Sequence, residues 1–233
     1  MRIVSLLQEI PSGIQPFDIQ GGLVKGTLNL LQTEDHQSGV VATGHFLKAG
    51  LARGERVGLI AFDNAATLLR IYTHYGFSFE EHLESEQLIY LYYKGTVSHS
   101  LCFTAHYSEV IDEILHLSGG HLDRLAVCRA DALINPQSLT LARESVQNLV
   151  SATTNIATTI FGYYCRSEHE QAQNVDLACR SFLLSYLSLT GSGPQDSYTL
   201  RWKVSPFPMK GPELTLTLRE GHGFIQEARA QRA

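Results

Sequence analysis

The sequence has few charged residues and no long apolar run, and each shortage argues against a class of protein. Charged residues make up 18% of the 233 residues, and the formal net charge is −5. Binding along a nucleic-acid backbone needs a basic face, so we do not expect a nucleic-acid partner. No apolar run approaches the roughly 20 residues that a membrane-spanning helix needs, so we expect no membrane insertion.

Cysteine is also scarce, and its spacing does not indicate paired sulfur chemistry. The chain has four cysteines, and none forms a Cys-x-x-Cys pair: Cys102, Cys128, Cys165 and Cys179. Buried free thiols in a reducing compartment fit this pattern. Glu9 and Pro11 interrupt the first segment too early for a secretory signal. We therefore expect a cytoplasmic protein.

Histidine, a common metal ligand, has ten copies. His99, Cys102 and His106 are spaced by three and four residues, which would suit one face of a helix. The surrounding segment "TVSHSLCFTAHYS" is not typical of a helix, and no second cluster completes a set of ligands. We expect neither a metal nor a cofactor.

The chain is rich in alternating strand-like and helix-like segments. Strands are predicted at 27–32, 56–62, 87–93, 123–130 and 155–164, and helices at 39–54, 64–76, 107–120 and 135–154. The Asn135-Pro136 step fits the start of the last helix. Segment 174–191 fits either a helix or a strand. This alternation predicts an α/β fold with a mostly parallel central sheet and helices on both faces.

The C-terminal part has a different pattern. Segments 197–205 and 213–220 alternate apolar and polar residues, and the Pro/Gly-rich stretch 206–212 joins them. This pattern predicts an antiparallel hairpin that extends the sheet. We find no repeat or linker, so we predict a single domain over residues 1–226 and a C-terminal tail over 227–233.

The opening phrase "IPSGIQPFDIQGGLVKG", residues 10–26, resembles the start of the KaiC-like group of RecA-type ATPases. That group begins with a phrase close to I-P-[ST]-G-I-x-[GP]-[FL]-D, followed by GGLxKG. Later segments are also similar to the group: "ARGERVGLIAFDN", "LDRLAVCRADAL" and "LRWKVSPFPMKGPELTLTLREGHGF". The resemblance covers nearly the whole chain and implies a RecA-like fold.

The phosphate loop that the resemblance implies is degenerate. In the working form G-x-x-x-x-G-K-[ST], the glycines let backbone N–H groups surround a phosphate, the lysine neutralises it and the hydroxyl holds Mg²⁺. Residues 33–40 read "TEDHQSGV". The four critical places therefore hold Thr33, Ser38, Gly39 and Val40. Glu34 and Asp35 add negative charge where a polyphosphate would lie.

The other catalytic places that the resemblance implies are altered too. Cys128 stands where the second nucleotide motif ends in a Mg²⁺-binding Asp, and Asp63-Asn64 replaces a Glu pair. Lys203 is retained from a Lys-x-Arg segment, but Ser205 stands at the Arg place. We expect no catalytic and no nucleotide-binding residues. The loop itself fits a structural turn, a nucleotide held by backbone groups at the helix start, or another small ligand.

The resemblance also implies an interface. The hairpin lies near the subunit boundary in the resembled group, and Trp202, Lys203, Phe207 and Met209 gather around its predicted tip. Aromatic residues and Met are enriched at interface cores. The tyrosines of 87–93 fit either a half-buried strand or an exposed contact patch.

Two functions follow as hypotheses. The preferred one is a non-catalytic RecA-like scaffold or regulatory subunit, which acts on a protein partner or forms a homo-oligomer. The alternative is a KaiC-like ATP-binding protein with weak or no hydrolysis. An RNA-binding subunit would need a basic stretch that the chain lacks.

Overall fold

The computed structural model describes residues 7–61, 64–92, 103–156, 158–165, 170–191, 196–207 and 213–226. The strands are β1 Glu9–Ile10, β2 Leu23–Val24, β3 Leu28–Thr33, β4 Val57–Ala61, β5 Leu88–Tyr92, β6 Arg124–Val127, β7 Thr159–Cys165, β8 Ser185–Gly191, β9 Ser197–Val204, β10 Glu213–Arg219 and β11 Gly223–Ile225. The helices are α1 Gln15–Asp18, α2 His36–Leu51, α3 Ala65–His74, α4 Glu80–Glu84, α5 Phe103–Leu117, the 3-10 helix η2 Ala130–Leu133, α6 Leu139–Ile156 and α7 Glu170–Phe182.

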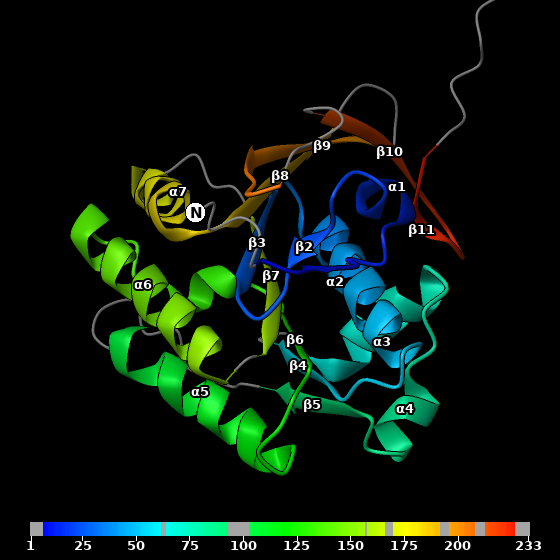
Figure 1. Ribbon diagram of the computed structural model, residues 1–233. Helices are drawn as coiled ribbons and strands as arrows, with labels where there is room; N and C mark the ends of the chain where they lie inside the picture. The colour runs from blue at the N-terminus through cyan, green and yellow to red at the C-terminus, as the bar shows by residue number, and fades with distance from the viewer. Residues whose placement is uncertain are drawn as a thin grey trace, which may run out of the picture.

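One nine-stranded sheet organises these elements, in the order β11-β10-β9-β8-β3-β7-β6-β4-β5 (Figure 1). The neighbouring strands from β8 to β5 pair in parallel, whereas the pairs β8–β9, β9–β10 and β10–β11 are antiparallel. Strands β1 and β2 form a separate antiparallel pair. The predicted α/β class, the mostly parallel sheet and its antiparallel C-terminal extension are confirmed.

The burial of each strand explains its sequence pattern. Every residue of β3, β4 and β6 is buried, because both faces of the parallel part are covered. Their polar residues, such as Asn29 and Arg124, are buried together with the apolar ones. In β10 buried and exposed residues alternate, because only one face packs on the core.

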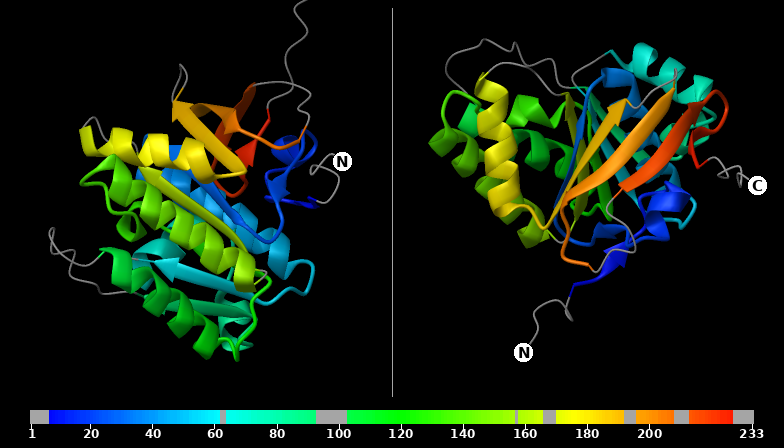
Figure 2. Two further views of the ribbon diagram at one scale, coloured as in Figure 1. Left: turned by 60° about the vertical axis from the view of Figure 1, so that its left-hand side comes forward. Right: turned by 90° about the horizontal axis from the view of Figure 1, so that it is seen from above.

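Helices cover both faces of the sheet and create two cores (Figure 2). On one face, α1, α2 and α3 pack through residues such as Phe17, Phe46 and Tyr72. On the other face, α5, α6 and α7 contribute residues such as Ile114 and Val146. Neighbouring residues of β3 point to opposite cores, since side chains alternate along a strand.

The phrase at residues 10–18 folds around one carboxylate. Asp18 accepts hydrogen bonds from Ser12 N at 2.7 Å, Ser12 Oγ at 2.7 Å and Gly13 N at 3.0 Å. Burial of this group raises its pKa. Gly13 has φ of +86°, and a Cβ there would lie 2.1 Å from the carbonyl oxygen of His45. The spacing of Ser12, Gly13 and Asp18 therefore serves local structure.

Several predicted boundaries were wrong, although the main elements were present. Segment 174–191 divides into the end of α7 and strand β8. The helix predicted from residue 39 begins at His36, and the helix predicted from Asn135 begins at Leu139, where Ser138 Oγ accepts from Leu141 N at 3.2 Å. Residues 155 and 156 belong to α6. Elements α1, α4, β1, β2 and β11 were not predicted, because each is too short to show a period.

Among the helices that the structure describes, none combines the length and apolarity needed to cross a membrane.

Candidate functional site

Residues 33–40, which the sequence resemblance assigns to a degenerate phosphate loop, run from the end of β3 into α2, at the carboxyl end of a central parallel strand. Thr33 is the last residue of β3, and α2 begins at His36. Only Glu34 and Asp35 connect them, so Ser38, Gly39 and Val40 already belong to the helix. The residues that would curve around a phosphate form the first helical turn instead.

The N-terminus of α2 is capped by the chain's own carboxylate. Asp35 Oδ1 accepts a hydrogen bond from Ser38 N at 2.7 Å. Thr33 Oγ1 and Ser38 Oγ both donate to the carbonyl oxygen of Asp35, at 2.9 and 3.2 Å. A helix N-terminus attracts anions through its free N–H groups and its dipole. In this protein the carboxylate of Asp35 lies where such an anion would bind.

Glu34 and Asp35 are also tied to the antiparallel part of the sheet. Glu34 Oε2 accepts from Gly191 N at 2.8 Å, which joins the ends of β3 and β8. Asp35 Oδ2 accepts from the hydroxyl of Tyr198 on β9 at 3.4 Å. Burial, followed by the negative charge of Asp35, raises the pKa of Tyr198 to about 12. Both acidic residues of the loop therefore have partners within the chain.

Gly39, at the place of the phosphate-loop lysine, has no room for a side chain. A Cβ built on Gly39 would lie 2.2 Å from Cδ2 of Tyr163. Tyr163 is buried on β7, and its hydroxyl lies 2.8 Å from Nδ1 of His36. A lysine at position 39 would require the Tyr163 ring to move.

Cys128, at the end of β6, lies in a closed and uncharged cluster. Its N–H donates to the carbonyl oxygen of Ile60 at 2.9 Å. Its Sγ lies 3.8 Å from Thr43 Oγ1 and 3.9 Å from the hydroxyl of Tyr72, and these two oxygens are 3.0 Å apart. Burial raises the pKa of Tyr72 well above its ordinary value. The described partners of Cys128 named here, Ile60, Thr43 and Tyr72, bring no carboxylate to it.

The structure places only part of the proposed histidine and acidic groups. His99, Cys102 and Asp63 fall outside the described residues, and of His106 only the backbone, in α5, is described. Across the ranges given above, no three His, Cys, Asp or Glu residues gather in a way that could hold a metal ion.

Trp202 lies in the core and not at a hairpin tip. It is 8% exposed, and its ring stacks on Phe17 with centroids 4.8 Å apart and planes 9° apart. Phe207 is partly buried, and its N–H donates to Ser205 Oγ at 3.2 Å. Met209 lies outside the described residues. Of the predicted interface residues, Trp202 is buried and little of its surface is open to a partner.

Lys203 belongs to an internal polar network that no sequence pattern had indicated. Its Nζ donates to Asp176 Oδ1 at 2.6 Å and to Gln32, and it lies 5.0 Å from the ring centre of Tyr186. Asp176 also accepts from the Tyr186 hydroxyl at 2.6 Å and from Arg180 at 2.8 Å. Burial opposes the charge of Asp176, but the bonds from Lys203 and Tyr186 outweigh it, so the pKa of this carboxyl is lowered.

Comparison with models of known protein families gives no match, and a search of curated proteins gives none either. The function is therefore argued from the geometry of the chain.

Proposed function

We propose that this protein is a non-catalytic RecA-like scaffold or regulatory subunit, which acts through contacts with other proteins. The observation that carries the proposal is the closed α2 N-terminus. Asp35 caps the helix at Ser38 N, 2.7 Å away, and Tyr163 fills the space beside Gly39. Both features lie at the position where a phosphate would have to bind.

The position matters because of the sheet topology. In open α/β sheets, ligands bind at the carboxyl ends of strands where successive connections lead to opposite sides. Here α2 leads from β3 toward β4, and α7 leads from β7 across β3 to β8. This arrangement supports a RecA-like interpretation and predicts a ligand crevice beside β3. In the described part of this crevice, Glu34 and Asp35 are hydrogen-bonded to other groups of the chain.

The energetics point the same way. A polyphosphate at this loop would displace the Asp35 cap, which contributes about 1 kcal/mol. It would also approach the charges of Glu34 and Asp35, at a cost of about 1 kcal/mol or more for each within a few ångströms. The loop residues 33–40 include no Lys or Arg to offset these costs. A nucleotide is therefore disfavoured before any catalytic group is considered.

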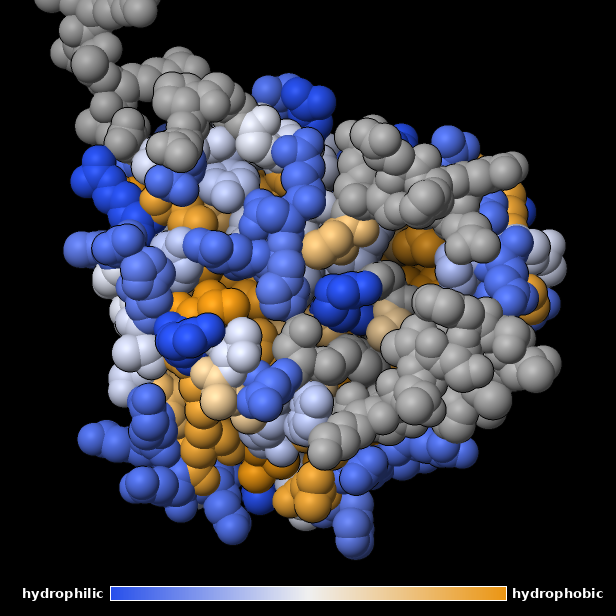
Figure 3. Space-filling model, turned by 180° about the vertical axis from the view of Figure 1, so that it is seen from behind, coloured by the Kyte–Doolittle hydropathy of each residue, from blue (hydrophilic) through white to orange (hydrophobic). Residues whose placement is uncertain are grey.

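With nucleotide binding disfavoured, we propose that the protein acts through contacts with other proteins. The described surface carries a few large apolar side chains at scattered places: Ile19, Tyr92, Leu117, Leu177 and Leu184. Figure 3 shows apolar areas between polar ones on the face opposite to Figure 1. A partner that covered such side chains would remove apolar surface from water, which favours binding.

Calorimetric titration with Mg-ATP tests the absence of nucleotide binding. We expect no saturable heat with the wild-type chain. The matched variants are Asp35→Asn, which removes one charge at the helix N-terminus, and Glu86→Gln, which removes one charge at an exposed site away from it. A micromolar Kd that tightens in Asp35→Asn but not in Glu86→Gln would overturn the proposal and favour a KaiC-like ATP-binding protein.

Light scattering coupled to size exclusion tests the role of the hairpin in contacts. The double variant Phe207→Ser/Met209→Ser changes the tip without touching the buried Trp202. We expect it to stay folded by circular dichroism and to lose part of its assembly. If assembly size and partners are unchanged, the interface lies elsewhere on the protein.

A further inference from the structure

The last two strands of the sheet differ in length, and the longer one has an open edge. β10 pairs with β9 over residues 213–217, whereas it pairs with β11 only over residues 217–219. β11 is the outermost strand at this end of the sheet (Figure 1). In the described part of the chain, no strand lies beside the first half of β10 on its outer side.

The backbone groups along this edge are directed outward. The N–H of Leu218 donates to the carbonyl oxygen of Asp196 at 2.8 Å, so the backbone of Leu218 points toward β9. Because this direction alternates along a strand, the backbone groups of Thr215 and Glu213 point to the open side. Both residues are exposed. An edge of this kind is a template for an extended segment.

The register of β10 and β11 identifies the segment that lies closest to the open edge. Residue 217 lies opposite 225, and residue 218 lies opposite 224. The same antiparallel register, continued along the chain, brings residues 227, 228 and 229 opposite 215, 214 and 213. The segment that follows β11 therefore reaches the edge without a loop, and its local concentration there is high because it is covalently attached.

The sequence of this segment suits both faces of the sheet. Residues 226–231 read "QEARAQ", in which small and polar side chains alternate. In the continued register, Ala228 shares the inner face with the buried Leu214, where a small apolar side chain fits. Arg229 shares the outer face with Glu213, which is exposed to solvent.

Charge also favours this segment at the edge. Glu213 Oε1 accepts from Arg201 on β9 at 2.6 Å, and the Glu213 side chain is half-exposed. Arg229 would approach the same carboxylate from the other side, so charges of alternating sign would cross three strands. Opposite charges directly across an antiparallel pair stabilise the pairing.

A helix is the competing structure for these residues, because Ala, Glu, Gln and Arg all have high helix propensity. A helix shorter than about 12 residues is marginal in water when it has no surface to pack on. The extended form has such a surface, since the edge of β10 supplies hydrogen-bonding groups directly beside β11.

We propose that residues 227–229 continue β11 along β10 and close this edge of the sheet within the chain. The edge is then available to an extended segment of another protein only when residues 227–229 are displaced. The inference goes beyond the proposed function and does not depend on it, because no residue at the N-terminus of α2 takes part.

Disulfide cross-linking tests the register. Thr215→Cys/Glu227→Cys places two thiols opposite each other, at a Cα separation of about 5.5 Å that a disulfide can span. We expect mild oxidation to give this disulfide within one chain, identified by peptide mapping of the monomeric species. Thr215→Cys/Ala228→Cys is the matched control. Its second thiol lies on the opposite face of the sheet, so it should cross-link at least ~10-fold more slowly.

A charge reversal tests the pairing with Glu213. In the Thr215→Cys/Glu227→Cys background, Arg229→Glu places a negative charge opposite Glu213, and we expect cross-linking to slow by about 2- to 5-fold. Arg232→Glu makes the same change of charge beyond the end of β10, and it should leave the rate unchanged.

Removal of residues 227–233 tests whether this segment closes the edge. We expect the shortened chain to self-associate more strongly than wild type in sedimentation velocity, because an open edge pairs with other strands. Circular dichroism checks that each variant is folded.

Three outcomes overturn the proposal. The two cysteine variants could cross-link at equal rates, the disulfide could join two chains, or the shortened chain could associate no more than wild type. The Mg-ATP titration is independent of all three. A failure here without Mg-ATP binding leaves the proposed function standing, whereas site-specific Mg-ATP binding removes that function and leaves the closed edge untouched.

Discussion

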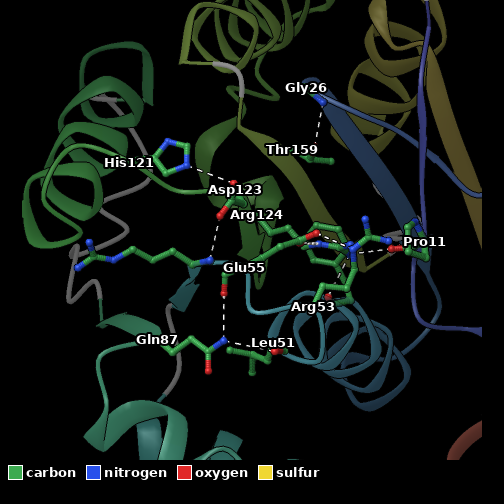
Figure 4. A network of polar contacts seen from close by, with 12 residues as sticks. Pro11, Gly26, Leu51, Arg53, Glu55, Gln87, His121, Asp123, Arg124 and Thr159 are labelled. Carbon is green, nitrogen blue, oxygen red and sulfur yellow. Dashed lines mark hydrogen bonds and ion pairs between the residues drawn. The ribbon is translucent and has the colours of Figure 1, made fainter.

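The two edges of the parallel sheet handle charge in different ways. At the carboxyl edge, Asp35 and Glu34 make short-range bonds to Ser38 N and Gly191 N, close to solvent. At the amino edge, Arg124 is completely buried. Figure 4 shows how this side chain joins segments that are far apart in sequence. The carboxyl edge is closed by hydrogen bonds of half-exposed carboxylates, one local to Ser38 and one to the distant Gly191, whereas the amino edge depends on one fully buried charge.

The amino-edge network is extensive. Arg124 pairs with Glu55, donates to the Pro11 carbonyl oxygen at 2.7 Å, and lies 4.9 Å from the Phe46 ring centre. Beside it, Asp123 accepts from the backbone N–H of residue 56 at 2.9 Å. Gln87 adds bonds to the carbonyl oxygens of residues 51 and 55, at 3.3 and 3.4 Å. These bonds connect β4, β5 and β6 at the point where each strand begins.

Removing the buried charge should have the largest effect. Arg124→Met leaves Glu55 without its buried partner, and we expect a loss of about 3 kcal/mol or more in the free energy of unfolding, measured by urea titration. The matched control is Arg53→Met, because Arg53 bonds the same carboxylate at 2.9 Å but is 59% exposed. We expect that control to cost less than ~1 kcal/mol.

The double variant Arg124→Met/Glu55→Leu checks the physical reason. Replacing both charges with apolar groups should recover part of the loss, since no unpaired buried charge then remains. Equal losses in Arg124→Met and Arg53→Met would show that burial does not set the contribution of a charge at the amino edge.

His45, in the middle of α2, gives a pH-dependent effect of similar size. Burial, with a further contribution from the charge of Lys48, lowers its pKa to about 4, and its Nε2 accepts from Phe224 N at 2.8 Å. Between pH 6.5 and 4, His45 binds a proton in the unfolded chain but not in the folded chain. Stability is therefore full above pH 6.5 and falls by roughly 3 kcal/mol as the pH drops to 4.

Urea unfolding at several pH values measures this effect. His45→Gln should flatten the slope between pH 6.5 and 4, because glutamine does not titrate. His222→Gln, which changes an exposed ring, should keep the wild-type dependence of stability on pH. If both variants keep it, His45 is not the cause.

Sequence patterns predicted the fold better than the site. The parallel strands were visible because segments such as 27–32 and 57–62 are short and rich in apolar residues, as burial on both faces favours. The first turn of α2 was missed because His36, Gln37 and Ser38 are polar and show no apolar period. Most long helices and strands followed from local pattern, but α7 and β8 were not told apart, and the shortest elements were not predicted.

The site shows the limit more clearly. The place of Gly39 was found from a motif, but the reason for a glycine there is the ring of Tyr163, a contact between distant residues. Trp202 was expected near a hairpin tip, but its partner Phe17 lies near the other end of the chain. Arg124 was assigned to a strand, and no local pattern marks it as a buried charge. The environments of Gly39, Trp202 and Arg124 are all set by contacts between residues that are far apart in the sequence.

Gly39→Ala tests how tightly the carboxyl edge is packed. Its Cβ would meet the Tyr163 ring at 2.2 Å, and we expect a loss of about 1–3 kcal/mol in the free energy of unfolding from overpacking. Gly191→Ala is the matched control at the same edge, because its Cβ would meet only the Glu34 carboxylate at 3.3 Å. Combining Gly39→Ala with Tyr163→Leu should cost less than the sum of the two single changes.

If the losses of Gly39→Ala and Tyr163→Leu are additive, the Tyr163 ring does not restrict the side chain at position 39. Gly39→Lys should be at least as destabilising as Gly39→Ala, and we expect it to create no heat with Mg-ATP in a calorimetric titration.

The smallest effect concerns the Asp35 cap, and it tests whether the carboxyl edge depends on charge or on a hydrogen bond. Asp35→Ala removes the acceptor for Ser38 N, and we expect a loss of about 1 kcal/mol in the free energy of unfolding. Asp35→Asn keeps an acceptor at the same place, and asparagine caps as well as aspartate does, so its loss should be smaller. Urea titration at low and high salt separates the two contributions, because only the charge interaction with the helix dipole is screened. A loss in Asp35→Asn as large as in Asp35→Ala, and reduced by salt, would mean that charge holds this edge too. Both edges would then depend on a charge, and they would differ only in how deeply that charge is buried.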